Sequence, residues 1–249
     1  MPEILLMEAK MKNNEPVTFK SKRHLFFDLD HTLWDFDKNA EETLIELFEI
    51  YNFQHLGFSS SAIFIETYTK NNHHLWSKYH MGEITKDQLR AARFINTFID
   101  LGIEPSLFPS QFEEDYLNLC PQKTNLFPYA IEVLEYLQNK YVLHLISNGF
   151  KKASETKIAT TGISKYFTQI IISENVGVHK PHPQIFNYAL NGALAEKSES
   201  VMIGDSIEAD IRGAQNFGID AIFFNPNRIN TPNDIRYQIT ELKELMEIF

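Results

Sequence analysis

The stretch that decides the fold is His24–Leu29, HLFFDL, which continues into Asp30-His31-Thr32. Its apolar run is short and ends in acids, which is typical of a buried strand. Similar runs predict strands at 141–146, 168–172, 200–203 and 221–224. Helical patterns at 129–139, 150–161, 183–195 and 207–217 separate these strands, and a closing helix is expected from about Asp234. Because alternating strands and helices form βαβ units, the sequence predicts an α/β fold with a Rossmann-like parallel sheet and helices on both faces.

Residues 39–122 have a different pattern, because helical segments follow one another there without a convincing strand. Thr85 with Gln88, and Ser110 with Glu113, have the spacing of a capping box, which predicts the start of a helix. Surface loops of a preformed sheet tolerate insertions of this size. The expected parts are an N-terminal tail at 1–20, an α/β core at 21–38 and 123–249, and an inserted all-helical cap domain at 39–122.

The charge balance argues against one class of partner. The 249 residues include 33 Asp and Glu against 23 Lys and Arg, a net charge of −10, whereas nonspecific binding to nucleic acid relies on basic patches. A single cysteine, Cys120, makes an internal disulfide impossible and fits a reducing compartment. No apolar run reaches the roughly 18 residues of a membrane-spanning helix, and the start of the chain is too charged for a secretory signal. These features predict a cytoplasmic protein whose partners include neither a nucleic acid polymer nor a membrane.

Acidic residues follow the first strand at a spacing that suits a metal. Residues two apart in an extended backbone point to the same side, so Asp28 and Asp30 can face one site. Two close carboxylates repel each other unless a proton or a cation relieves the repulsion, and Mg²⁺ prefers oxygen ligands. The alternative is a strand end whose acids only cap the next helix.

Polar residues also follow the later strands, near the carboxyl end of the sheet where open α/β folds bind ligands. Ser147-Asn148-Gly149 suits an anion at a helix N-terminus, although it is equally an ordinary strand-to-helix turn. Lys180, held extended by Pro181, would neutralise carboxylates and a phosphate. Asp205 would complete an oxygen cluster for magnesium, and Asp210 could orient Asp205, Lys180 or metal-bound water.

Together, DLDHT at 28–32, ISNG at 146–149, Lys180 and GDSIEAD at 204–210 resemble the haloacid dehalogenase superfamily, over about 24–38 and 126–225. The helical insert resembles the first type of cap domain in that superfamily. A closer resemblance, to bacterial pyrimidine 5′-nucleotidases, rests on FDLDHTLWDFD, LWSKYHMGEIT with Arg93-Phe94, ISNGF, ISENVGVHKP with IFNYAL, and GDSIEADI. That family dephosphorylates nucleoside monophosphates. The N-terminal extension of 20 residues lies outside the pattern.

The resemblance implies a role for each core residue. Asp28 would be the nucleophile, and Asp30 the general acid and then the general base. Mg²⁺ would be held by the Asp28 carboxylate, the Asp30 backbone carbonyl and the Asp205 carboxylate. Phosphoryl oxygens would be bound by Ser147, the Asn148 N–H and Lys180, with Asp210 supporting the site from behind. In the cap and near it, the candidates for binding the leaving group are Trp34, Trp76, Tyr79 and Arg93, for each of which packing is the alternative.

Three other functions fit parts of this pattern. A phosphatase that acts on sugar phosphates or other small metabolites has the same core, and only the cap resemblance argues against it. A haloacid dehalogenase needs no phosphate-directed acid at Asp30, so that residue favours phosphoryl transfer. A non-catalytic interaction protein would not be expected to retain the whole polar set. The expected partner is a small phosphorylated metabolite, and no feature of the sequence indicates an oligomeric state, a preferred base or a preferred sugar.

Overall fold

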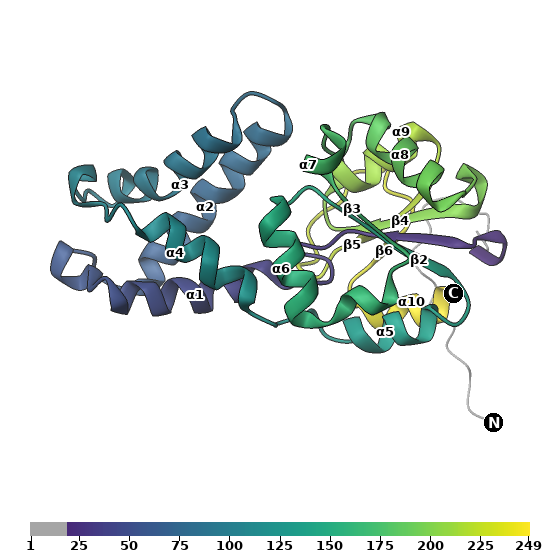
Figure 1. Ribbon diagram of the computed structural model, residues 1–249, viewed down its shortest axis with the longest axis horizontal. Helices are drawn as coiled ribbons and strands as arrows, with labels where there is room; N and C mark the ends of the chain where they lie inside the picture. The colour runs from purple at the N-terminus through teal and green to yellow at the C-terminus, as the bar shows by residue number, and fades with distance from the viewer. Residues whose placement is uncertain (1–18) are drawn as a thin grey trace. The chain divides into compact units, whose positions relative to one another are not determined.

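The computed structural model describes residues 19–249, so the tail expected at 1–20 lies almost entirely outside the described residues. The chain forms two compact units, each with its own core (Figure 1). Unit 1 comprises the described residues up to Asp35 together with Leu126–Phe249, and unit 2 comprises Phe36–Asn125. The boundaries between these two units lie after residues 35 and 125.

Unit 1 is built on a parallel sheet with the strand order β3-β2-β1-β4-β5-β6. The strands are β1 (His24–Phe27), β2 (Val142–Ser147), β3 (Gln169–Ile172), β4 (Ser200–Gly204), β5 (Asp220–Phe224) and β6 (Gln238–Ile239). β1 lies in the centre, with His24 in register with Val142 on one side and Ser200 on the other. The strand order reverses at β1, so the carboxyl ends of β1 and β4 form the switch point where open α/β sheets bind their ligands.

Helices cover both faces of the sheet (Figure 1). α7 (Ser173–Val176), α8 (Pro183–Ala193) and α9 (Gly213–Phe217) lie on one face, and α5 (Ala130–Leu137) and α10 (Leu245–Ile248) lie on the other. α6 (Lys151–Thr161) follows β2, and a π-helix, η7 (Ile207–Arg212), precedes α9. On the α8 face, Phe26 and Met202 pack against Ile185 and Ile211. Because helices cover both faces of the sheet, side chains on both sides of the central strands are buried, and the sequences of these strands are nearly continuous apolar runs.

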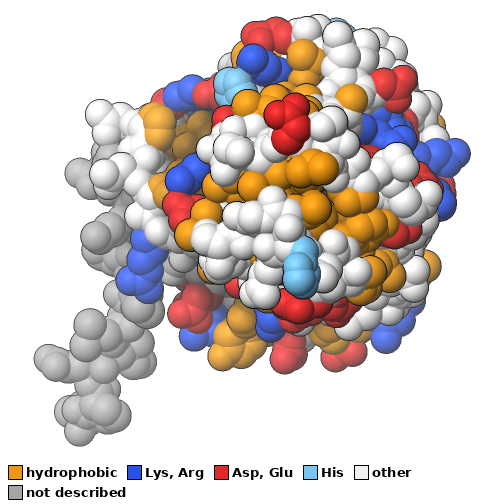
Figure 2. Space-filling view, turned by 90° about the vertical axis from the view of Figure 1, so that its left-hand side faces the viewer, with side chains coloured by type: hydrophobic (Ala, Val, Ile, Leu, Met, Phe, Trp, Pro, Cys, Tyr) orange, Lys and Arg blue, Asp and Glu red, His pale blue; other side chains and the backbone are white. Residues whose placement is uncertain are grey.

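Unit 2 is all-helical among its described residues. Its main helices are α1 (Phe36–Ile50), α2 (Ser61–His80), α3 (Lys86–Asp100) and α4 (Phe112–Leu119). Their core is aromatic: the Phe53 ring lies 5.1 Å from Phe58, 5.4 Å from Phe98 and 5.0 Å from Phe112, measured between ring centroids. Hydrophobic side chains are also exposed on the outer face of this unit, among scattered acidic and basic ones (Figure 2).

Two local predictions were wrong, and one was confirmed. The capping box of Thr85 and Gln88 is present at the start of α3. Ser110 and Glu113 form none, because α4 begins after Gln111 and the Phe112 N–H donates instead to Pro109 O, at 3.0 Å. The closing helix expected from Asp234 is replaced by β6 and the short α10. There, the Phe223 and Asn225 N–H groups donate to backbone carbonyls of the segment, at 2.9 and 2.7 Å, so pairing with the sheet edge outweighs helix formation.

The protein has no membrane-spanning helix among residues 19–249, because each helix there is too short or too polar.

Candidate active site

Four side chains of unit 1, those of Asp28, Lys180, Asp205 and Asp210, meet at the carboxyl end of the sheet, and Ser147 lies at the end of a neighbouring strand. Asp28 directly follows β1, Ser147 is the last residue of β2, and Asp205 directly follows β4. Lys180 lies between α7 and α8, and Asp210 lies in η7. These residues are far apart in the sequence, and the parallel arrangement brings the ends of their strands to one edge. The site therefore forms at the switch point, where the sequence predicted it.

Lys180 is at the centre of this group, with 1% of its residue surface exposed. Its ammonium pairs with the carboxylates of Asp28 and Asp210, the second at 2.7 Å. It also donates to Ile146 O, at 2.7 Å. Its hydrogen bonds go to Asp28 and Ile146 O, whereas the contact with Asp210 is an ion pair. Lys180 thus fixes the positions of two carboxylates relative to β2.

The carboxylates of Asp28, Asp205 and Asp210 form a cluster in which one oxygen of each lies within 4.8 Å of the others. Thr32 Oγ1 donates to Asp205 Oδ1 at 3.1 Å. Asp210 Oδ2 accepts from the Ser206 N–H at 3.0 Å, and its side chain packs so closely against Gly204 that a Cβ there would overlap it. Glycine at position 204 therefore allows the buried Asp210 to approach Lys180.

The pKa values of two carboxyl groups in this cluster are raised, because they are buried and one lysine does not balance the negative charge around it. Burial raises the pKa of Asp28 well above its ordinary value, while Lys180 opposes the shift. Burial and the Asp210 carboxylate raise the pKa of Asp205 to about 8. Burial alone would lower the pKa of Lys180, but Asp210 and Asp28 outweigh it and raise that pKa. In the part of the chain that the structure describes, one ammonium thus faces three carboxylates.

Ser147 and Asn148 form the other wall of the site. The Asn148 side chain accepts from the Lys180 N–H and donates to Lys180 O, both at 2.9 Å, so it locks the β2 loop to the lysine backbone. Ser147 Oγ accepts from the Gly149 N–H at 3.0 Å. Because the Asn148 side chain is used in this way, the group that the loop offers to an anion is its backbone.

Asp30 is held apart from the three clustered carboxylates. Its Oδ1 accepts from Lys157 Nζ in α6, at 2.6 Å. The ammonium of Lys157 lies 4.1 Å from the centre of the Trp34 ring, and the Trp34 side chain is completely buried in unit 1. The structure therefore places Trp34, predicted as a residue that binds the leaving group, in the packing beneath Lys157.

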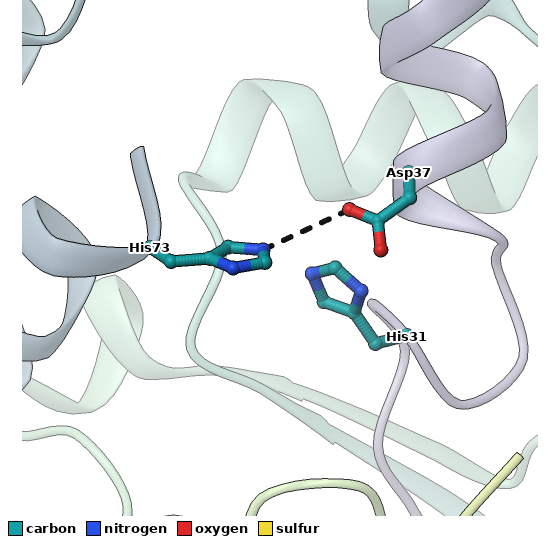
Figure 3. A group of neighbouring side chains, drawn as sticks. All are labelled: His31, Asp37 and His73. Atoms are coloured by element: carbon teal, nitrogen blue, oxygen red, sulfur yellow. Dashed lines mark ion pairs between the residues drawn. The ribbon is translucent and has the colours of Figure 1, made fainter. Parts of the chain in front are cut away.

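The three candidates in unit 2 lie in two places. Trp76 and Tyr79 are partly exposed near the end of α2, with ring centroids 5.6 Å apart. Arg93 is buried in α3, where its guanidinium binds both oxygens of Glu113 at 2.7 and 3.1 Å and lies 4.8 Å from the centre of the Tyr116 ring. These contacts favour the packing alternative for Arg93. Elsewhere in this unit, His73 Nε2 lies 3.7 Å from Asp37 Oδ1, and both side chains are about half exposed (Figure 3).

Two residues of the site were not singled out by sequence reasoning. Thr32 follows the acid pair within the same motif, so its proximity to Asp205 could have been anticipated. Lys157 is 127 positions from Asp30 and lies on a helix, where a lysine side chain is usually expected to be exposed to solvent. Its only signal was the three-residue spacing from Ser154, which places both residues on one face of α6.

The comparisons with known proteins agree with this geometry. The model of the haloacid dehalogenase-like hydrolase family matches residues 22–218. The chain is 31% identical to the pyrimidine 5′-nucleotidase YjjG of Escherichia coli, over 90% of this chain and 96% of that protein. It is 30% identical to the pyrimidine 5′-nucleotidase PynA of Streptococcus pneumoniae, over 90% and 94%. The crystal structure of the HAD-hydrolase YfnB from Bacillus subtilis, bound to magnesium, is similar with a TM-score of 0.80 and 28% identity, over 91% and 98%.

These matches extend over both units, and the two nucleotidases are covered along nearly their whole length. Relatives with this extent of similarity are named as hydrolases of phosphate monoesters. The acids after β1 and β4, the turn after β2 and the buried lysine are the features on which the family resemblance was based. The chain belongs to the haloacid dehalogenase-like hydrolase family and is a phosphatase of that family.

Proposed function

We propose that this phosphatase is magnesium-dependent and hydrolyses pyrimidine nucleoside 5′-monophosphates through an aspartyl-phosphate on Asp28. The observation that carries the proposal is the convergence of three buried carboxylates and Lys180 at the switch point of the sheet. Such a cluster is costly to bury, so its presence supports a function that uses the charges. The nucleotidase relatives support the class of substrate.

The residues present fit a magnesium ion. Carboxylate and carbonyl oxygens are the ligands that Mg²⁺ prefers, and the excess negative charge around Lys180 is the kind that a divalent cation offsets. Asp28, Asp205 and the backbone carbonyl of Asp30 would hold the ion. When bound, it supplies stabilisation for the charge of the phosphoryl group.

Asp28 and Asp30 divide the chemistry into two steps. An Asp28 oxygen attacks phosphorus and forms the P–O bond of the aspartyl-phosphate, while the bond from phosphorus to the leaving oxygen breaks and Asp30 gives that oxygen its proton. Asp30 then takes a proton from a water molecule, whose oxygen attacks phosphorus and releases Asp28. After the second step Asp28 is again a free carboxylate and Asp30 again carries a proton, so the cycle consumes only the phosphate ester and one water molecule.

Ser147, Asn148 and Lys180 bind the phosphoryl oxygens in this proposal. The Ser147 hydroxyl and the Asn148 N–H donate hydrogen bonds to them. Lys180 already donates to Asp28 and Ile146 O and forms an ion pair with Asp210, so it acts on the phosphoryl group mainly through its charge. This arrangement orients the substrate without moving the lysine.

A screen of purified protein tests the substrate class. We expect pyrimidine nucleoside 5′-monophosphates to be hydrolysed with higher kcat/KM than purine nucleotides and sugar phosphates. Base discrimination needs hydrogen bonds that the wrong base leaves unpaired, so the preference should be strongest between bases of different size and polarity. A screen in which sugar phosphates exceed every pyrimidine nucleotide would contradict the substrate assignment and leave the phosphatase chemistry intact.

A magnesium titration tests the metal. Asp205→Asn should raise the magnesium concentration for half-maximal activity by roughly tenfold or more, because a neutral amide binds a hard cation weakly. Glu208→Gln is the matched control: its side chain is exposed and pairs with Arg212, so the titration should be unchanged. A wild-type titration curve for Asp205→Asn would exclude Asp205 as a ligand. Chelation should abolish wild-type activity, and added magnesium should restore it.

A further inference from the structure

Lys157 is a buried lysine that the catalytic scheme above does not use. It lies in α6, and 5% of its residue surface is exposed. A buried ammonium is costly unless it is paired. Here the pairing is to the carboxylate of Asp30, with 2.6 Å between Lys157 Nζ and Asp30 Oδ1. This ion pair joins α6 to the loop that follows β1.

The position of Lys157 is itself fixed. Its ammonium lies over the Trp34 ring, 4.1 Å from the centroid, and the ring is completely buried. A cation over an indole face is attracted by the ring quadrupole, and the attraction is stronger in a desolvated site. Trp34 in turn is bound to the Asp30 loop, because its carbonyl accepts from the His31 N–H at 2.9 Å and its N–H donates to Leu29 O at 2.8 Å.

Asp30 is enclosed on its other side by the turn after β2. A Cβ at Gly149 would lie 3.1 Å from Asp30 Oδ2 and 2.6 Å from Ser154 Oγ, so only glycine leaves room for both side chains. Ser154 precedes Lys157 by one turn of α6, and its Oγ lies 3.4 Å from Ser147 Oγ. One face of α6 thus contacts both Ser147, at the end of β2, and the Asp30 carboxylate.

We propose that Lys157 is a positioning residue, which holds the Asp30 carboxylate in one orientation from which it exchanges protons with the leaving group. The inference rests on the proposed function, because it takes Asp30 as the general acid. Geometry alone supports it: one oxygen of Asp30 is bound to a buried, stacked ammonium, and the other lies against Gly149. Without Lys157, the Asp30 side chain would sample other rotamers.

Leaving-group chemistry distinguishes positioning from mere packing. An alkyl oxygen is a poor leaving group and needs a proton from Asp30, whereas p-nitrophenolate leaves as a stable anion. Lys157→Met keeps the length and apolar stem of the side chain but removes the ammonium. We expect it to lower kcat/KM for a nucleoside 5′-monophosphate at least roughly tenfold more than kcat/KM for p-nitrophenyl phosphate.

The experiment uses a double-mutant cycle with magnesium at saturation. Asp30→Asn should itself show the selective loss on the alkyl phosphate, and Lys157→Met should add no further selectivity in the Asp30→Asn background. Lys157→Arg retains a cation, so it should recover part of the kcat/KM for the nucleoside 5′-monophosphate that Lys157→Met loses. Lys152→Met, an exposed lysine on the same helix, is the control and should leave both rates unchanged. Circular dichroism melts of each variant identify those that fold.

The outcomes separate the two proposals. A selective loss in Lys157→Met that disappears in the Asp30→Asn background supports the positioning role. Equal losses on both substrates, or a selective loss that persists without the Asp30 carboxylate, would overturn it while the proposed function stands. If Asp30→Asn shows no dependence on the leaving group, the role of Asp30 as general acid is wrong, and the inference falls with it. If Lys157→Met does not fold, Lys157→Arg decides: a partial loss confined to the nucleoside monophosphate supports the role, and equal losses on both substrates, or no loss on either, overturn it.

Discussion

Asp28, the proposed nucleophile, is surrounded by groups that restrain its side chain. Lys180 pairs with its carboxylate, and the backbone of Lys180 is fixed by two hydrogen bonds to the Asn148 side chain. This restraint keeps a carboxylate oxygen in one place at the carboxyl end of β1, as attack on phosphorus requires. Burial, with smaller contributions from Asp210 and Asp205, raises the pKa of Asp28, which is an unfavourable environment that a purely structural aspartate would not need.

Asp28→Asn should therefore lower turnover by on the order of 10³-fold or more, since an amide oxygen cannot form the phosphoryl ester. The volume is unchanged, and one of three neighbouring negative charges is removed. We expect the melting temperature to stay within a few degrees of the wild type. Steady-state rates on p-nitrophenyl phosphate, together with a thermal melt, measure both quantities. Wild-type turnover by a pure, folded Asp28→Asn preparation would rule out Asp28 as nucleophile.

At this scale the sequence predicted the residues that follow strands, because strand ends converge in a parallel sheet. Asp28, Asp205 and Lys180 were predicted to lie together, and the structure brings them together. Lys157 could not be found in this way, because its partner is 127 positions away and helix periodicity does not reveal a buried charge. The burial of Arg93 was equally open, since an arginine on an amphipathic helix suits solvent, substrate or an ion pair.

At the scale of elements, α3 and α4 of unit 2 are joined by a buried ion pair. Arg93 has 2% of its residue surface exposed and binds Glu113 through two hydrogen bonds. Arg93→Met should destabilise the protein by about 3–5 kcal/mol, because Glu113 is left in a largely buried site without its partner. Arg90→Met is the matched control: Arg90 pairs with the same glutamate, but its side chain is 30% exposed, so a loss of about 1 kcal/mol or less is expected.

Urea unfolding of the two variants measures the difference. If Arg93→Met is as stable as Arg90→Met but has lost kcat/KM for nucleotides selectively, Arg93 binds substrate, as the sequence suggested. A double variant with Glu113→Gln should recover part of the stability, because the unpaired charge is then removed.

The elements that the sequence predicted best are those whose pattern is set locally. The Thr85–Gln88 capping box and the five main strands follow from short-range signals. β6 did not, because its two residues are a strand only through pairing with β5 at the sheet edge. The start of α4 was misplaced for a similar reason, since Pro109 O accepts from the Phe112 N–H and no side-chain cap forms.

At the scale of the whole molecule, the sheet of unit 1 contains a pair of histidines that links β1 to β2. His24 Nδ1 lies 3.0 Å from His144 Nε2, and the His144 ring stacks on Phe26 at 4.6 Å between centroids. His144 is completely buried. Burial, with a smaller contribution from the His24 charge, lowers the pKa of His144 to about 4, and burial also lowers the pKa of His24. The neighbouring charged groups are Arg23, which lowers the pKa of His24, and Glu199, which raises it.

This pair predicts a loss of stability in acid. An unfolded histidine binds its proton near pH 6.5, and the folded His144 near pH 4, so the unfolded state binds more protons between these values. Stability from this residue is therefore complete above about pH 6.5 and is lost progressively as the pH falls toward 4. His144→Gln removes the titration and keeps a side-chain amide that can either donate to His24 or accept from it. The free energy of unfolding of the wild type, minus that of His144→Gln, should fall by about 1–3 kcal/mol between pH 7 and pH 4.5. Urea unfolding across this range measures the difference. A constant difference for His144→Gln would mean that the buried imidazole takes up its proton in the folded state as readily as in the unfolded one. The burial of His144 against His24 and Phe26 of β1 would then not govern the acid stability of the sheet.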